Sequence, residues 1–211
     1  MNKQYRLING LIVLFAFVSS GLIYSSLPNI MAIHWNIDGV ADGFGNKRFA
    51  LFVTPGIMLA LFLLFTLLPL NTQLKLKLER FSISYDYISC IVLIFMAYIH
   101  VLIITANLEQ NFNSLKYTIS GMALLFMFIG NLLPKTKLNA VMGIRTPWTL
   151  DNEQVWFLTH RLAGRLVVGI SLFVFIANFV GLNPVVSICL LIGSFLIPAV
   201  YSYVISKKYS V

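Results

Sequence analysis

The stretch FALFVTPGIMLALFLLFTLLPL, residues Phe49–Leu70, decides the fold, because it holds no charged residue over the length that a helix needs to cross a bilayer. About 20 apolar residues span the roughly 30 Å hydrocarbon layer. The 211-residue chain is 59% hydrophobic and 10% charged, with a mean hydropathy of +0.87, which is typical of membrane proteins. Five further runs are long and apolar enough to span: Leu7–Ser26, Tyr85–Ala106, Leu115–Leu133, Leu162–Gly181 and Pro184–Ser206.

These runs predict helices. Only helices and closed barrels satisfy their backbone hydrogen bonds in lipid, and the runs lack the apolar–polar alternation of barrel strands. We therefore predict an all-α polytopic membrane protein, a bundle of six transmembrane helices that forms a single integral domain over residues 1–211. The first run is expected to be a retained helix rather than a cleaved signal peptide, because it continues past the small residues Ser19, Ser20 and Gly21.

The basic residues predict the orientation, because cytoplasmic loops carry the excess of Lys and Arg. Among the 15 Lys and Arg residues, the side opposite to the two termini holds only Lys47, Arg48 and Lys116. Both termini should therefore lie in the cytoplasm. Attraction to anionic lipid head groups accounts for the net charge of +8, so membrane lipids are the expected partner and nucleic acid is not. The basic residues on the cytoplasmic side are Lys3, Arg6, Lys75, Lys77, Arg80, Lys135, Lys137, Arg145, Arg161, Arg165, Lys207 and Lys208.

The longest outer connection, residues 27–48, reads LPNIMAIHWNIDGVADGFGNKR. Pro28 ends the first helix because it has no N–H to donate. The residues after it alternate with the period of a strand, which puts His34 and Asn36 on one face. We predict an extracellular extended loop or hairpin.

Two Asp-Gly pairs in this connection, Asp38-Gly39 and Asp42-Gly43, are typical of turns, because glycine accepts positive φ and aspartate bonds its own backbone. Aromatic rings are stable at the membrane interface, so Trp35 and Phe44 are expected to anchor the segment there.

Some of these side chains have the chemistry of metal ligands. His34, Asp38 and Asp42 could hold a divalent cation, but a solvated turn with ordinary Asx hydrogen bonds fits them better. The chain has three histidines and no His-Glu-x-x-His, Gly-x-Ser-x-Gly or phosphate-binding glycine motif. We therefore expect no cofactor and no enzymatic activity. His100, inside the third run, is better explained as a neutral histidine bonded to a neighbouring helix than as part of a proton path.

The inner connection, residues 131–165, is unusually polar for so apolar a chain. Gly143 permits a tight bend, and Thr146 must be extended because it precedes a proline. A helix is expected to begin near Thr149 or Asp151, either of which can cap it.

Further along this connection, Trp156, His160 and Gly164 fall at i, i+4 and i+8, so they share one helix face. We predict a cytoplasmic lateral helix that leads into the fifth span. Arg145 and Arg161 fit two roles. They could bind phosphate, carboxylate or a protein partner, or they could tie the loop to backbone carbonyls or acidic neighbours.

Two motifs together resemble one known family. The outer motif is Ile33-His-Trp-Asn36 with Gly39 and Asp42-Gly43. The inner motif comprises Asn139, Gly143-Ile-Arg-Thr-Pro-Trp-Thr-Leu150, Val155-Trp156 and Thr159-His-Arg161. Their sequence, their spacing and the six runs resemble the SdpI family of bacterial membrane proteins, whose founding member is an immunity protein against a secreted toxin.

The resemblance implies a multi-pass protein of the bacterial cell membrane that protects the cell from a membrane-active toxin peptide and can capture a cytoplasmic transcriptional repressor. The other class left open is a transporter or membrane enzyme for a small or lipidic anionic ligand, in which the arginines hold the anion and a histidine handles a proton. The residues expected to bind or signal are His34, Trp35, Asn36, Asp42, Asn139, Arg145, Thr146, Pro147, Trp148, Trp156, His160 and Arg161.

Overall fold

The computed structural model describes residues 1–70, 82–109, 111–139 and 142–209. Within them, six helices are long and apolar enough to cross a membrane, which confirms the predicted multi-pass, all-α fold. Lys75, Lys77 and Arg80, used above for the orientation, lie outside the described residues. By its internal contacts the chain divides into two compact units, which we call the N-terminal unit (Met1–Gly121) and the C-terminal unit (Met122–Val211). The single domain over residues 1–211 stays a prediction.

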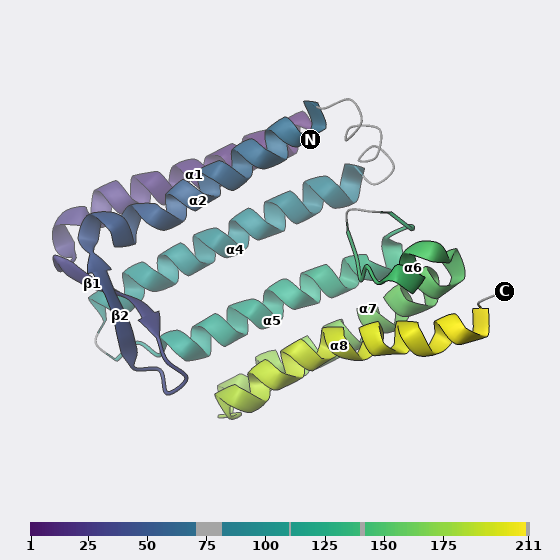
Figure 1. The fold of residues 1–211 in the computed structure, drawn as a ribbon. Helices are drawn as coiled ribbons and strands as arrows, with labels where there is room; N and C mark the ends of the chain where they lie inside the picture. Colours follow the sequence, from purple (N-terminus) through teal and green to yellow (C-terminus); the bar gives the residue numbers. More distant parts are fainter. Residues whose placement is uncertain (71–81, 110, 140–141, 210–211) are drawn as a thin grey trace. The chain divides into compact units, whose positions relative to one another are not determined.

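The N-terminal unit consists of long helices and one hairpin. Figure 1 shows three of these helices side by side, with the hairpin at one end. Large apolar side chains such as Leu22 and Leu63 are exposed along the helices, as expected for surfaces that face lipid. The elements are α1 (Lys3–Ile23) with a 3-10 turn (Tyr24–Ser26), β1 (Ile30–Trp35), β2 (Ala41–Asn46), α2 (Lys47–Leu67) with a 3-10 turn (Leu68–Leu70), α4 (Ser82–Leu108) and the first turns of α5 (Ser114–Leu132).

The hairpin confirms the strand predicted from the alternation. β1 and β2 pair antiparallel, with register shifts beside His34. Gly39 takes the positive φ of 78° at the turn, as its Asp-Gly pair predicted. The turn predicted at Asp42-Gly43 is wrong, because both residues lie within β2. Gly43 instead permits close approach of the strands, since a Cβ built there would lie 2.8 Å from the Cβ of His34.

One serine joins the three long helices inside the N-terminal unit. Pro55 interrupts α2 and has no N–H for the carbonyl oxygen of Leu51, four residues earlier. The buried Ser20 hydroxyl of α1 lies 2.9 Å from that oxygen, and its hydrogen is shared with the Ala16 carbonyl at 2.9 Å. His100 of α4 places Nε2 3.2 Å from the same hydroxyl. His100 is therefore bonded to a neighbouring helix, as expected from its place in the third run.

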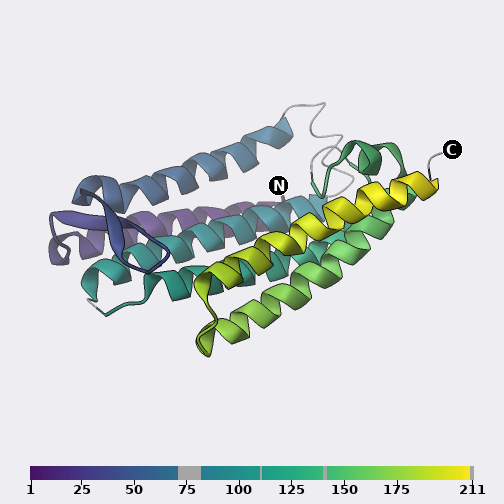
Figure 2. The same ribbon diagram turned by 60° about the horizontal axis from the view of Figure 1, so that its bottom comes forward.

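The C-terminal unit comprises a helical hairpin and the inner motif. In Figure 2, α7 and α8 run side by side, and the short α6 lies against the end of this pair. Leu133, Ala163 and Val167 form a buried cluster. The elements are the rest of α5, a 3-10 turn (Leu133–Lys135), α6 (Pro147–Asp151), α7 (Glu153–Phe179) and α8 (Pro184–Tyr209).

The helix starts in the inner motif differ from the predicted ones. Thr146 rather than Thr149 caps α6, in a capping box whose N3 residue is Thr149. Asn152 caps α7 through bonds from the backbone N–H groups of Gln154 and Val155. Helix α7 (Glu153–Phe179) continues without a break through the fifth span, and a lateral helix at its start stays a prediction.

Loss of the Ser20 hydroxyl should destabilise the N-terminal unit. Ser20→Ala leaves the Leu51 carbonyl without a donor at a buried site, and we expect a loss of about 1 kcal/mol in the free energy of unfolding. Thermal unfolding in detergent measures it, with the exposed Ser25→Ala as a neutral control. Adding Pro55→Ala supplies a backbone N–H to Leu51 and should restore part of the stability. A double variant no more stable than Ser20→Ala would contradict this assignment.

Candidate functional site

The outer hairpin is fastened to α4 by one amide side chain. Asn107 accepts a hydrogen bond from the Ala32 N–H through Oδ1 (2.8 Å) and donates one to the Ala32 carbonyl through Nδ2 (2.9 Å). At the base of the hairpin, the Lys47 ammonium donates to the Leu27 carbonyl at 2.7 Å and lies over the Tyr24 ring. The hairpin is thus fixed on α4 through backbone atoms of β1.

A histidine and an aspartate meet on the exposed side of this hairpin. His34 Nδ1 lies 2.5 Å from Asp42 Oδ1, and the two side chains are 69% and 45% exposed. The pair joins β1 to β2 across the bulge that Gly43 permits. Two predicted site residues are therefore brought together in contact with water.

Asn36 stabilises the turn of the hairpin. Its Oδ1 accepts hydrogen bonds from the N–H groups of Asp38 (3.0 Å) and Val40 (2.9 Å). Among the described residues, no three His, Cys, Asp or Glu side chains gather in a group that could hold a metal ion. Through its bond to Asn36, the backbone of Asp38 belongs to a turn of the Asx type.

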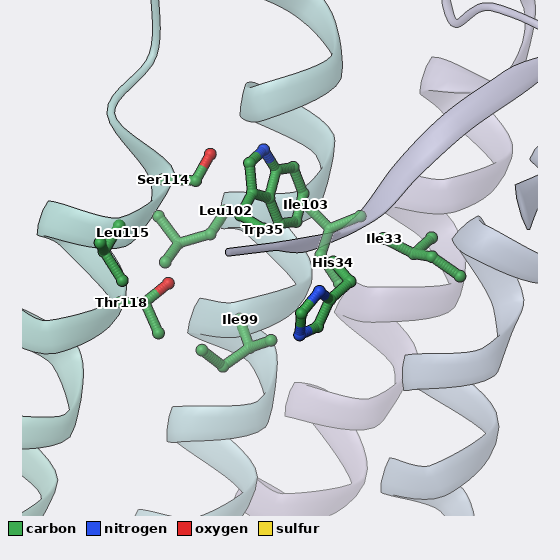
Figure 3. A pocket seen from close by; sticks show the side chains of 9 residues that line it. All are labelled: Ile33, His34, Trp35, Ile99, Leu102, Ile103, Ser114, Leu115 and Thr118. Atoms are coloured by element: carbon green, nitrogen blue, oxygen red, sulfur yellow. The ribbon is translucent and has the colours of Figure 1, made fainter. Parts of the chain in front are cut away.

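A cavity of about 300 Å³ lies between the hairpin, α4 and the start of α5 (Figure 3). Trp35 lines it together with His34. The hydroxyl of Ser114, at the first turn of α5, is buried and has no hydrogen-bond partner among the residues that the structure describes. The predicted outer residues thus border a mostly apolar hollow. Its lining is Ile33, His34, Trp35, Ile99, Leu102, Ile103, Ser114, Leu115 and Thr118.

In the C-terminal unit, Trp156 and His160 form a buried stack at the centre of the inner motif. Their rings lie 4.0 Å apart between centroids and share the helix face predicted from their spacing. His160 Nδ1 donates to the Trp156 carbonyl at 2.8 Å, and Nε2 accepts from the Ile144 N–H at 2.9 Å. Trp156 Nε1 donates to the Thr136 carbonyl at 2.9 Å. Because both nitrogens of His160 are engaged and the residue is 1% exposed, it fixes the loop rather than presenting a proton to a ligand.

Gly143 completes this packing. It has a φ of 118°, in the region that favours glycine, and a Cβ there would overlap both the His160 and the Trp156 ring. Gly164, on the same face of α7, packs against Pro134 so closely that a Cβ would overlap the proline ring. Both glycines are required by close approach of other side chains.

Hydroxyl groups bind the next part of the motif to α8. The Thr149 hydroxyl donates to the Ile144 carbonyl at 2.8 Å. The Trp148 indole N–H donates to the Ser202 hydroxyl at 2.5 Å, and Thr146 Oγ1 lies 3.3 Å from the same oxygen. Most of the conspicuous polar residues of this motif therefore hold it in shape.

The two arginines remain at the surface. Arg145 is exposed, and Arg161 is exposed with its guanidinium 6.0 Å from the centroid of the Phe157 ring. Neither forms an ion pair with the acidic residues in the part of the chain that the structure describes. Pro147 begins α6, and Asn139 forms a local turn with Met142. The arginines are thus placed where a partner can reach them.

Residues of several kinds escaped the sequence analysis. Asn107 could have been found as an amide near the end of an apolar run, since such amides often bond other segments in membrane proteins. Ser114 and Ser202 carry no comparable signal, because single serines are common at helix starts and within spans. Asn152 directly follows the two predicted caps, Thr149 and Asp151, and belongs to the same class of capping residues.

Comparison with known proteins supports the family suggested by the two motifs. Residues 135–206 match the model of the SdpI/YfhL protein family, and residues 11–59 match a domain of unknown function, DUF1648. The chain is 27% identical over 174 residues to the Immunity protein SdpI of Bacillus subtilis (strain 168), which covers 82% of this chain and 81% of that protein. No solved structure gives a significant match.

The role of Asn107 can be tested by its removal. Asn107→Ala breaks both bonds to Ala32, so the free energy needed to open the hairpin locally falls by the contribution of those bonds. We therefore expect the amide of Ala32 to exchange its hydrogen at least about tenfold faster. Hydrogen exchange with mass spectrometry in detergent measures this. Thr105→Ala is the control, since that hydroxyl bonds the Val101 carbonyl of its own helix. Unchanged protection of the hairpin would show that Asn107 does not hold it.

Gly143→Ala should destabilise the inner motif by about 1–3 kcal/mol, because it combines an unfavourable φ with overlap against buried rings. Gly169→Ala, in an open position of α7, is a control of opposite sign, since alanine is the better helix former. Thermal unfolding followed by tryptophan fluorescence gives both values. Equal stabilities of the two variants would refute the close packing at Gly143.

Proposed function

We propose that this chain is an SdpI-like immunity protein of the bacterial plasma membrane, which protects the cell from a secreted, membrane-active toxin peptide. The observation that carries the proposal is the 27% identity to the Immunity protein SdpI over 82% of the chain. The similarity extends over most of both sequences.

The hairpin faces the outside in this proposal. It connects α1 to α2, and the connection after α4 lies near it at the same end of the N-terminal unit. The chain crosses the membrane twice between these two connections, through α2 and α4, so both connections lie on the same side. The inner motif follows a further crossing and lies in the cytoplasm. The excess of basic residues near the inner motif and the C-terminus supports this orientation.

The outer hairpin is the toxin contact in this proposal. Loops held on a rigid support commonly carry recognition, and Asn107 supplies such a support by fixing the backbone of Ala32. His34, Trp35 and Asp42 are accessible on it. Asn36 contributes by keeping the turn in shape.

The inner motif signals to the cytoplasm in this proposal. Exposed Arg145, Pro147 and Arg161, with the half-buried Trp148, form the surface that captures a transcriptional repressor. Arginine and tryptophan are favoured in protein interfaces. The buried Trp156 and His160, with the half-buried Asn139 and Thr146, position that surface. Toxin changes the exposure of this surface only if the toxin binds two states of the protein with different affinity.

Survival of a sensitive bacterial strain tests this function. Cells that carry the protein should tolerate more of the cognate toxin, or of one peptide in a membrane-active panel, than cells with an empty vector. His34→Ala should lose most of this protection at equal membrane abundance, because it removes the pair with Asp42. Asp38→Ala, at the tip of the turn, is the matched control and should protect fully. Absence of protection by the unmodified protein against every peptide would reject the proposal.

A further inference from the structure

The cavity beneath the hairpin has the size of one side chain. Its volume of about 300 Å³ stands at the lower end of the roughly 300–1,000 Å³ that small-molecule sites occupy. Its walls come from three elements of the N-terminal unit, and Figure 3 shows the α5 residues Ser114, Leu115 and Thr118 on one side and the hairpin residues Ile33 and His34 on the other. Such a hollow takes a single bulky group rather than a length of chain.

The walls specify an apolar group with one polar atom. Ile99, Leu102, Ile103 and Leu115 offer aliphatic surface. Ser114 is 4% exposed, and its hydroxyl has no partner within the described part of the chain, although a buried hydroxyl without a hydrogen bond costs free energy. The Asn113 side chain already accepts the hydrogen bond from the Lys116 N–H that caps α5, so the Ser114 hydroxyl is not needed for the cap.

The mouth of the cavity favours a peptide over a lipid. The nine lining residues include no Lys or Arg to hold a phosphate, and an acyl chain would leave the Ser114 hydroxyl unbonded. His34, in the lining, is 69% exposed and paired with Asp42, so one rim of the cavity is in water. A dissolved peptide can therefore reach it.

We infer that this cavity binds one aromatic side chain of a peptide, a tryptophan or tyrosine whose N–H or O–H bonds the Ser114 hydroxyl. The inference rests on the proposed function only for the source of the peptide, which would be the toxin. Aromatic side chains suit the site because they combine a large apolar surface with a polar atom at the edge of the ring.

Binding of model amides to the full-length protein in detergent tests the inference without any toxin. The probes are N-acetyl-tryptophanamide and N-acetyl-phenylalaninamide, detected by saturation-transfer NMR. We expect the tryptophan amide to bind about 3- to 10-fold more tightly, which is the net worth of one hydrogen bond. Ser114→Ala should abolish this preference while the phenylalanine amide binds as before. No preference in the unmodified protein would overturn the inference.

Filling the cavity gives a second test. Thr118→Phe places a ring in the space and should abolish binding of both amides. Val101→Phe is the matched control, since Val101 is exposed on α4 and does not line the cavity, and should bind them normally. Unimpaired binding to Thr118→Phe would overturn the inference. Decanol that displaces the amides completely from the unmodified protein and binds Ser114→Ala equally would also overturn it and identify an acyl-chain site.

The survival assay separates this inference from the proposed function. If the unmodified protein gives no protection but the amides bind as expected, the proposed function fails and the cavity assignment stands. If the unmodified protein protects and Thr118→Phe protects equally at the same abundance, immunity stands and the cavity has no part in holding the toxin.

Discussion

The structure depends on one constraint: in lipid, each backbone N–H and carbonyl must find its hydrogen bond within the protein. Regular helices meet this requirement unaided. At three described places away from regular helical bonding, one within a span and two in the hairpin and the inner motif, a short polar side chain supplies a bond to the backbone. Ser20 serves the carbonyl that Pro55 deprives of its donor, Asn107 serves both groups of Ala32, and Thr149 serves the Ile144 carbonyl.

The same constraint explains how much of the fold the sequence predicts. The bilayer sets the length of a span, so the apolar runs of that length in the sequence find the six helices. The period of the residues before Trp35 predicts the strand. The turn predicted at Asp42-Gly43 is wrong because Gly43 is needed for the close approach of His34 and not for a turn. The predicted helix start differs from that of α7 because Thr149, Asp151 and Asn152 can each cap a helix, and only packing selects Asn152.

The candidate sites follow from the sequence to a smaller degree. Helical spacing predicts the shared face of Trp156 and His160, since it involves one element. It cannot predict that His160 bonds the backbone of Ile144, because that contact depends on the path of a loop. Asn107 and Ala32 are 75 positions apart, and nothing in the sequence distinguishes Ser114 from other serines. The cavity beneath the hairpin therefore cannot be predicted before α4, α5 and the hairpin are assembled.

The way in which the hairpin is fastened bears on its evolution. Asn107 holds main-chain atoms, which every residue type except proline supplies, so the attachment does not depend on the side chains that the hairpin displays. Exposed positions such as Ile37, Val40 and Phe44 can therefore change without loosening the support. The displayed surface can thus change one substitution at a time, while the helices beneath the hairpin stay the same.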